Sequence, residues 1–535
     1  MLALSGCYSG MQDFDPGETA GPGAASGASD DAPAEPTEPT AGEEVTCDGG
    51  PGVSAAPMRR LTGLEYDNTI RDLLHDDSRL AEGFQPDEEV GGFAANSVGK
   101  LDKSQLDEYV AAAEELAHSA VDERWERLVG CDASGPGCVE SFVEGFGRRA
   151  FRRPLSTTEQ ADYLELYEDA TAEWGPTEGV AMVIQAMLLS PYFLYHVEPA
   201  DEPGVQPVSR FALASRLSYF AWASMPDDEL LDAAEAGELT QPEQVEQQIR
   251  RLLADERAAA TITSFHRQWL HIQGLPEKVK DPTLFPAWNE SLGQSMEQET
   301  LRFVDQVVRH GDGTLQTLLT APWTVADATL AEHYGVPAPD EDWAVVPLPA
   351  DERAGLLTHA SFLTSTAHAG ENSWAHRGKF VREKMLCHVL PPPPMNVGSN
   401  EPNDPSRLED PNCNFCHLQM DPIGIGLDAY NPIGIFGPEG PDGETISTEG
   451  QVLGVEGLES FDGAVELATA LAKAPQVHDC MAKQWFRYGV RRVDTEADAC
   501  TLEQLRGTFA ESGQDIQELM VAIALSTAFR YQLNE

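Results

Sequence analysis

Two cysteines and a histidine stand together at Cys413, Cys416 and His417, in the sequence CNFCH. Two thiols three residues apart, followed at once by a histidine, are the attachment signal of a covalently bound c-type haem. The thiols add to the two vinyl groups of the porphyrin, and the adjacent imidazole becomes an axial ligand of the iron. The motif therefore predicts haem c bound through Cys413 and Cys416, with His417 as the proximal iron ligand.

Three other chemistries use a similar cysteine pair: a local disulfide, a redox dithiol and half of a zinc site. A structural zinc site needs four ligands, usually from a second Cys/His pair, and the nearest such pair is Cys387 and His388. A thioredoxin-like dithiol expects a βαβ setting, whereas proline- and glycine-rich stretches flank this motif. Haem attachment is the favoured interpretation, and a disulfide or a metal knuckle remains the alternative.

The ligand on the opposite face of the iron decides between two functions. A second protein ligand produces an electron carrier, whereas an open position admits an oxidant or a substrate. Met420 is too close to His417 in the sequence to reach that face, so the first candidates are Met481 and His368. Further candidates are His376, His388, Met395 and His478. A carbonyl near Pro422 or Pro432 is expected to fix the other nitrogen of His417.

The charge balance excludes one class of partner. The chain has 89 acidic and 35 basic residues, a formal net charge of −54. Nucleic-acid binding needs clustered lysine and arginine to neutralise phosphate, so no nucleic-acid partner is expected. The same charge repels anionic membrane surfaces and is compatible with a saline environment.

The amino terminus indicates export. The residues before Cys7 resemble a bacterial lipobox, in which the cysteine becomes the lipidated terminus. A complete signal peptide has a basic start and a longer apolar run, so this leader is expected to be truncated. The stretch 8–45 is rich in Gly, Ala, Pro and acid and is expected to be a flexible tether. We therefore expect a lipid-anchored protein of the cell envelope, in the periplasm or at the outer-membrane surface of a Gram-negative bacterium, with no membrane-spanning helix.

Helical periodicity dominates the rest of the chain and predicts a mainly α fold of several packed modules. Thr62 with Glu65, and Ser156 with Glu159, are capping-box patterns. Residues 84–98 are expected to form an irregular loop, residues 391–394 a polyproline strut, and residues 434–457 a small β-hairpin. The expected units are a leader and linker (1–46), an N-terminal helical module (47–130), a second module (131–203), a central module (204–340), a cytochrome-c-like segment (350–457) and a C-terminal module (458–535).

An internal repeat and six further cysteines complete the pattern. The region after Cys138, with Phe146, Arg152 and Arg153, has a counterpart after Cys480, so related helical units of roughly fifty residues are expected. Spacing suggests disulfides that join Cys131 to Cys138 and Cys480 to Cys500. Cys47 and Cys387 are then left as a long-range pair, although sequence alone does not fix the connectivity.

The order of these segments resembles the large secreted proteins of planctomycetes and myxobacteria that are built from cytochrome-c-associated domains of unknown function. The resemblance rests on residues 60–69, RAFRRP at 149–154, SRFALASRLSYF at 209–220, 376–394, CNFCHLQMDPIG at 413–424, and QWFRYGVRR at 484–492. It implies a haem held by Cys413, Cys416 and His417. The family often has arginines in a later Gly-Arg-Trp-Arg-like element, where this chain has GIFG at 434–437. If such arginines neutralise haem propionates, the nearest substitutes in this sequence are Arg377, Arg382 and Arg407.

Two classes of function follow from these expectations. The first is a mono-haem cytochrome-like protein that exchanges electrons with a redox partner protein. The second is a haem-dependent oxidoreductase, an oxidase or peroxidase, that acts on an extracellular substrate. A non-redox surface binding protein, in which Cys413 and Cys416 staple a loop, is the third interpretation.

Overall fold

The computed structural model describes residue 47 and residues 52–55, 58–198, 202–392, 403–440 and 443–534. Within these ranges the chain is mainly α-helical, which confirms the predicted fold class. The predicted lipidation site Cys7, the linker that follows it and the second half of the proline run lie outside the described residues. None of the described helices has the length and apolar content needed to span a bilayer.

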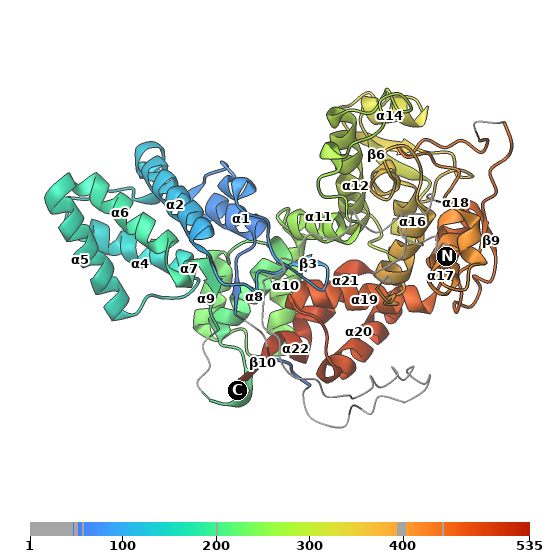
Figure 1. Cartoon of the computed structure of the whole chain (residues 1–535). Helices are drawn as coiled ribbons and strands as arrows, with labels where there is room; N and C mark the ends of the chain where they lie inside the picture. The colour runs from blue at the N-terminus through green and yellow to red at the C-terminus, as the bar shows by residue number, and fades with distance from the viewer. Residues whose placement is uncertain are drawn as a thin grey trace, which may run out of the picture.

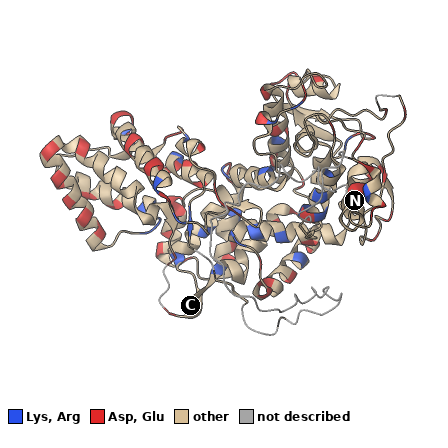
Figure 2. Ribbon diagram, viewed as in Figure 1, with Lys and Arg blue, Asp and Glu red and all other residues tan. Residues whose placement is uncertain are grey.

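The first part of the described chain is a helical lobe, drawn at the left of Figure 1. Its helices are α1 (Gly63–Leu74), α2 (Lys103–Glu123), α3 (Trp125–Leu128), α4 (Cys138–Ala150), α5 (Thr157–Trp174), α6 (Pro176–Leu188) and α7 (Pro191–Leu194). The expected capping box starts α1, because the Thr62 hydroxyl accepts from the Glu65 amide and the Glu65 carboxylate accepts from the Thr62 amide. Tyr66 packs against Tyr109 and Phe193 in a core that belongs to this lobe. Acidic residues lie along its outer helices (Figure 2).

The stretch 84–98 differs from the irregular loop expected there. It contains a short hairpin of strands β2 (Glu89–Val90) and β3 (Phe93–Ala94). Gly91 and Gly92 form its turn with φ angles of 65° and 89°, a left-handed backbone that glycine adopts without steric cost.

Helix α8 (Arg210–Trp222) connects the lobe to the end of the chain. The Tyr219 hydroxyl accepts from Arg152, which follows α4, and the adjacent Phe220 packs on Phe529 with 5.5 Å between the ring centroids. The helices that follow are α9 (Asp228–Ala236), α10 (Pro242–Ala254), α11 (Ala258–Trp269), α12 (Glu290–His310), α13 (Leu315–Thr320) and α14 (Ala328–Tyr334). Trp222 and Trp269 are fully buried, as their place on the apolar stripes predicts.

The remaining helices carry the cysteine motif and the C-terminal unit. They are α15 (Ala360–Ser365), α16 (Trp374–Phe380), the π-helical turn η4 (Val381–Met385), α17 (Asn414–Ile425), α18 (Gly463–Leu471), α19 (Pro475–Val490), α20 (Ala499–Glu511), α21 (Ile516–Leu525) and α22 (Thr527–Arg530). Short 3-10 turns lie at η1 (Leu80–Gly83), η2 (Leu275–Glu277), η3 (Leu356–Thr358), η5 (Pro405–Leu408) and η6 (Glu496–Asp498). One apolar core runs from α8 to α22, so the central helices and the C-terminal helices share a core.

The structure contains the expected internal repeat. Helices α4, α5, α6 and α7 are followed by strand β4, and helices α19, α20, α21 and α22 are followed by strand β10. Arg152 and Arg491 follow the first helix of each unit with φ angles of 57° and 54°. The next arginine pairs with the carboxylate six residues later in both units: Arg153 with Glu159, and Arg492 with Asp498.

The strands are short and pair antiparallel in twos. β1 (Arg59–Arg60) pairs with β4 (Tyr195–His196), β5 (Gly204–Pro207) with β10 (Tyr531–Asn534), β6 (Trp323–Ala326) with β7 (Ala344–Pro347), and β8 (Glu449–Gly450) with β9 (Phe461–Asp462). The hairpin expected within residues 434–457 is therefore displaced, because its second strand begins at Phe461. Val452 donates to the Leu458 carbonyl, and this closed loop separates the two strands.

The disulfides correct two of the three suggested pairings. Cys131 bonds to Cys138, the pair that spacing suggested. Cys480 bonds to Cys387 instead of Cys500, and Cys500 bonds to Cys47. The reason lies in the packing: α19 lies against η4, which brings Cys480 to Cys387 with 5.4 Å between their Cα atoms.

Candidate functional site

The cysteine motif lies at the start of α17. Cys413 occupies the N-cap position, and Cys416 and His417 follow in the first turn. His417 is buried, and its Nδ1 lies 3.0 Å from both carboxylate oxygens of Asp421, one helical turn later. Residues four apart share one face of a helix, which explains why these two side chains meet. Because Asp421 engages Nδ1, the Nε2 atom of His417 is the nitrogen left for a metal.

This finding corrects the expected partner of His417. A carbonyl near Pro422 or Pro432 was expected at the free ring nitrogen, but the carboxylate of Asp421 occupies that place. The Asp421 side chain is almost completely buried, and the Arg407 Nη2 atom lies 3.8 Å from its Oδ2. Arg407 comes from η5 and is itself buried, so its charge offsets that of the buried carboxylate.

A close crossing of α16 and α17 holds the motif in place. A Cβ on Gly378 would lie 1.9 Å from the Met420 carbonyl oxygen, and a Cβ on Gly424 would lie 2.1 Å from the Trp374 carbonyl oxygen. Only glycine allows backbones to approach this closely. The contact fixes the position of α17, and with it Cys416 and His417, relative to the rest of the core.

Of the three arginines named from the sequence, Arg382 and Arg407 contact α17, and Arg377 contacts the chain that follows it. Arg377 donates to the Leu427 carbonyl, and Arg382, in the π-helical turn, donates to the Gln419 carbonyl. The Nη2 atom of Arg382 is buried without a hydrogen-bond partner among the described residues, whereas the Nη2 atom of Arg407, also without a hydrogen bond, lies at ion-pair distance from Asp421. Buried guanidinium nitrogens without acceptors suit an anionic group such as a haem propionate.

The two cysteines of the motif differ in state. Cys416 is a free thiol beside the apolar side chains of Ala375, Leu390 and Met420, and burial raises its pKa. Cys413 is disulfide-bonded. The suggestion that Cys413 and Cys416 staple a loop by bonding to each other is therefore wrong, because Cys416 is free.

The donor set fits a haem at this place. It provides a thiol, an imidazole whose tautomer is fixed by a carboxylate, and buried cationic nitrogens near the same helix. Among the described residues there is no cluster of three or more His, Cys, Asp or Glu side chains that could hold a metal ion by themselves. A zinc knuckle, the second alternative, thus has no ligand set in the described part of the chain.

The two candidates for the opposite iron ligand lie in different surroundings. Met481 is buried in the principal core on α19. The His368 ring lies 5.0 Å from the ring of His376. His376 is two residues before Gly378, about 200° around α16, so its side chain points away from the face that crosses α17. The assignment of either residue as a ligand stays a prediction.

Asp421 is the site residue that sequence reasoning missed. Its signal was the spacing of four residues between a histidine and a carboxylate inside one helix. Pro422, in the second half of α17, obscured that signal because proline usually ends or bends a helix.

Comparison with protein families finds five consecutive matches, each described as a protein of unknown function. In chain order they are DUF1587 (59–122), DUF1595 (138–198), DUF1592 (208–336), DUF1588 (353–439) and DUF1585 (458–529). The motif and its surroundings lie in the DUF1588 match, which has the short name PSCyt3. No curated protein and no solved structure matches the chain.

The chain is thus a multidomain helical protein made of five domains of unknown function. Together the five matches cover most of the chain between residues 59 and 529, and none of their descriptions names an activity.

Proposed function

We propose that this protein is an exported, lipid-anchored, mono-haem c-type cytochrome-like protein that exchanges electrons with a redox partner. The observation that carries the proposal is the buried pair of His417 and Asp421 directly after Cys416. A carboxylate at Nδ1 fixes the tautomer of a metal-ligating histidine and increases the basicity of its other nitrogen. A haem bound there would supply one-electron chemistry.

The residues of this chain have separate tasks in the proposed site. Cys413 and Cys416 would anchor the porphyrin, and His417 would ligate the iron through Nε2. Asp421 holds the imidazole, and Arg407 compensates the charge of Asp421. Arg382, which donates to the Gln419 carbonyl of α17, has a buried Nη2 atom without a hydrogen-bond acceptor among the described residues, and this nitrogen would stabilise an anionic substituent.

The proposal is tested with the full chain, exported in a bacterial host that assembles c-type cytochromes. We expect a Soret band and a haem stain that survives denaturation, because thioether bonds are covalent. Cys416→Ser and His417→Gln should lose most of that signal, whereas the exposed-histidine control His310→Gln should keep it. Colourless wild-type protein would overturn the proposal.

A second candidate function, a haem-dependent oxidase or peroxidase, is favoured by the same carboxylate. An axial imidazole that is hydrogen-bonded to a carboxylate donates more electron density to iron, as strongly donating axial ligands do in haem enzymes that activate oxygen. Binding of carbon monoxide or cyanide separates the two functions: an absorption shift indicates an open iron, and no shift indicates a closed electron carrier.

For both functions, Asp421→Asn should raise the reduction potential of the iron, while Glu409→Gln, an exposed control, should leave it unchanged.

A further inference from the structure

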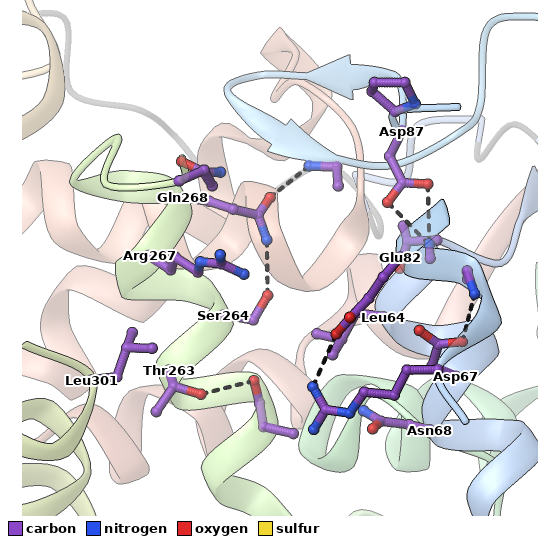
Figure 3. A pocket seen from close by; sticks show the side chains of 18 of the residues that line it. Leu64, Asp67, Asn68, Glu82, Asp87, Thr263, Ser264, Arg267, Gln268 and Leu301 are labelled. Carbon is purple, nitrogen blue, oxygen red and sulfur yellow. Dashed lines mark hydrogen bonds and ion pairs between the residues drawn. The ribbon is translucent and has the colours of Figure 1, made fainter. Parts of the chain in front are cut away.

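A cavity of about 990 Å³ lies between the N-terminal lobe and helices α11 and α12, far from the motif in the sequence. Figure 3 shows its two walls. One consists of α1, η1 and the chain before β2, which contribute Leu64, Asp67 and Glu82; the other consists of α11 and α12, which contribute Gln268 and Leu301. The volume is at the upper end of the range for ligand sites, roughly 300–1,000 Å³, so it can hold several linked rings.

The charge of the cavity differs from that of the whole protein. Its lining has six carboxylates and five cationic side chains, which nearly cancel, whereas the chain has 89 acidic and 35 basic residues. A polyanion would meet those carboxylates inside a strongly negative molecule and would be repelled. A purely apolar ligand would leave the lining polar groups without hydrogen bonds, which costs binding free energy. A neutral ligand rich in donors and acceptors avoids both penalties.

Three side chains of the lining offer free hydrogen-bonding groups. Gln273 and Gln298 line the cavity and are exposed, and their side-chain amides have no hydrogen bond to the described residues. Asp67 is half-buried and accepts one hydrogen bond, from the Ala81 amide at 2.9 Å. Within the described ranges, no basic side chain pairs with Asp67, so one of its oxygens remains available.

The backbone of the cavity argues against a peptide ligand. Extended peptides usually bind by adding a strand to a free sheet edge. In the β2–β3 hairpin, Ala94 lines the cavity, and both of its backbone polar groups are already used. Its amide donates to Gln268 Oε1 at 2.7 Å, and its carbonyl accepts from Arg491 at 2.9 Å.

We infer that this cavity is a binding site for a neutral oligosaccharide. Hydroxyl groups both donate and accept, which matches the carboxylate of Asp67 and the amides of Gln273 and Gln298. Leu64 and Leu301, on opposite walls, provide apolar contact for the C–H faces of sugar rings. The inference does not depend on haem, because none of these residues belongs to the site on α17.

Calorimetric titration of the full chain tests the inference, with the hexasaccharides of cellulose, mannan, xylan and chitin as probes. A heparin hexasaccharide and an uncharged hexapeptide represent the competing ligand classes. At least one neutral sugar should bind with a Kd below about 10 mM. Asp67→Asn should weaken that binding about tenfold, because a charged acceptor forms a stronger hydrogen bond than an amide does. Gln298→Ala should weaken it by a similar factor.

The matched control is Asp107→Asn on α2, an exposed carboxylate outside the cavity, which should bind like wild type. Gln298 is exposed, so its truncation is expected to leave the fold intact even if Asp67→Asn does not fold. The inference is overturned if no neutral hexasaccharide binds, if only heparin or the peptide binds, or if both cavity variants retain wild-type affinity.

Discussion

Asp67 gives the proposed sugar site a dependence on pH. Burial, more than any neighbouring charge, raises the pKa of this carboxyl to about 6. The charged form is the stronger hydrogen-bond acceptor, so affinity for a neutral oligosaccharide should fall as the pH decreases below about 6 and level off above it. The Kd measured between pH 5 and pH 8 should show this inflection for wild type. In Asp67→Asn the inflection should be absent, and a wild-type inflection in that variant would contradict the assignment.

At the same scale, the residues of the haem motif could be named from the sequence, but the contact that orients them could not. The spacing of Cys413, Cys416 and His417 identifies the motif in the sequence. Asp421 gains its role only because α17 continues through Pro422, so that the carboxylate returns to the His417 ring after one turn. The environment of Arg407 also depends on tertiary structure, since η5 must fold back on α17 to bring its guanidinium to Asp421.

Among the elements, the crossing of α16 and α17 decides where the motif is held. Gly378→Ala would place a methyl group against the Met420 carbonyl, so the two helices would have to separate. We expect a loss of roughly 1–3 kcal/mol in the free energy of unfolding, measured by urea denaturation. Cys416 should also react faster with a thiol reagent, because its apolar cover on α16 moves away.

Gly145→Ala is the matched control for that substitution. Gly145 is an exposed position inside α4, and a Cβ there meets no atom within 4 Å. Alanine should therefore stabilise the protein by about 0.5–1 kcal/mol through its higher helix propensity. If both alanine variants had the same effect on stability, the close helix crossing would not explain why position 378 requires glycine.

The internal repeat allows the same arginine–carboxylate ion pair to be compared at two degrees of burial. Arg492 and Asp498 are nearly inaccessible and form two hydrogen bonds of 2.7 and 2.8 Å. Arg153 and Glu159 form the equivalent pair at a partly exposed position. Arg492→Ala leaves a buried carboxylate uncompensated and should cost about 3–5 kcal/mol. Arg153→Ala should cost roughly 1 kcal/mol, since water screens the partner that remains. If urea denaturation showed the same loss in the free energy of unfolding for both variants, burial would not determine how much the ion pair contributes to stability.

Local elements were predictable where short-range chemistry fixes them. The capping boxes at Thr62 and Ser156 are present, and so is the repeated order of helices. The disulfides of Cys480 and Cys500 were not predictable in the same way. Their partners are 93 and 453 residues away in the sequence, and only the packing of α19 on η4 and the path of the N-terminal segment bring them together.

For the whole molecule, the dominant physical property is its charge. A net charge of −54 makes the compact state repel itself more strongly than the expanded chain, because folding brings the charges closer together. Figure 2 shows acidic residues on the outer helices of the N-terminal lobe, far from most of the basic ones. Added salt shortens the screening length from about 30 Å at 0.01 M to about 3 Å at 1 M, which removes most of this repulsion.

The melting temperature should therefore rise steeply with NaCl, with most of the gain complete once the screening length is below the spacing between surface charges. Differential scanning calorimetry between about 0.01 M and 1 M NaCl measures the effect. Sucrose at equal osmolality is the control, since it is excluded from the protein surface but screens no charge. A larger response to salt than to sucrose assigns the effect to electrostatics. Equal responses would mean that the acidic surface does not limit stability, and a flat response to NaCl would remove the physical basis for expecting a saline environment.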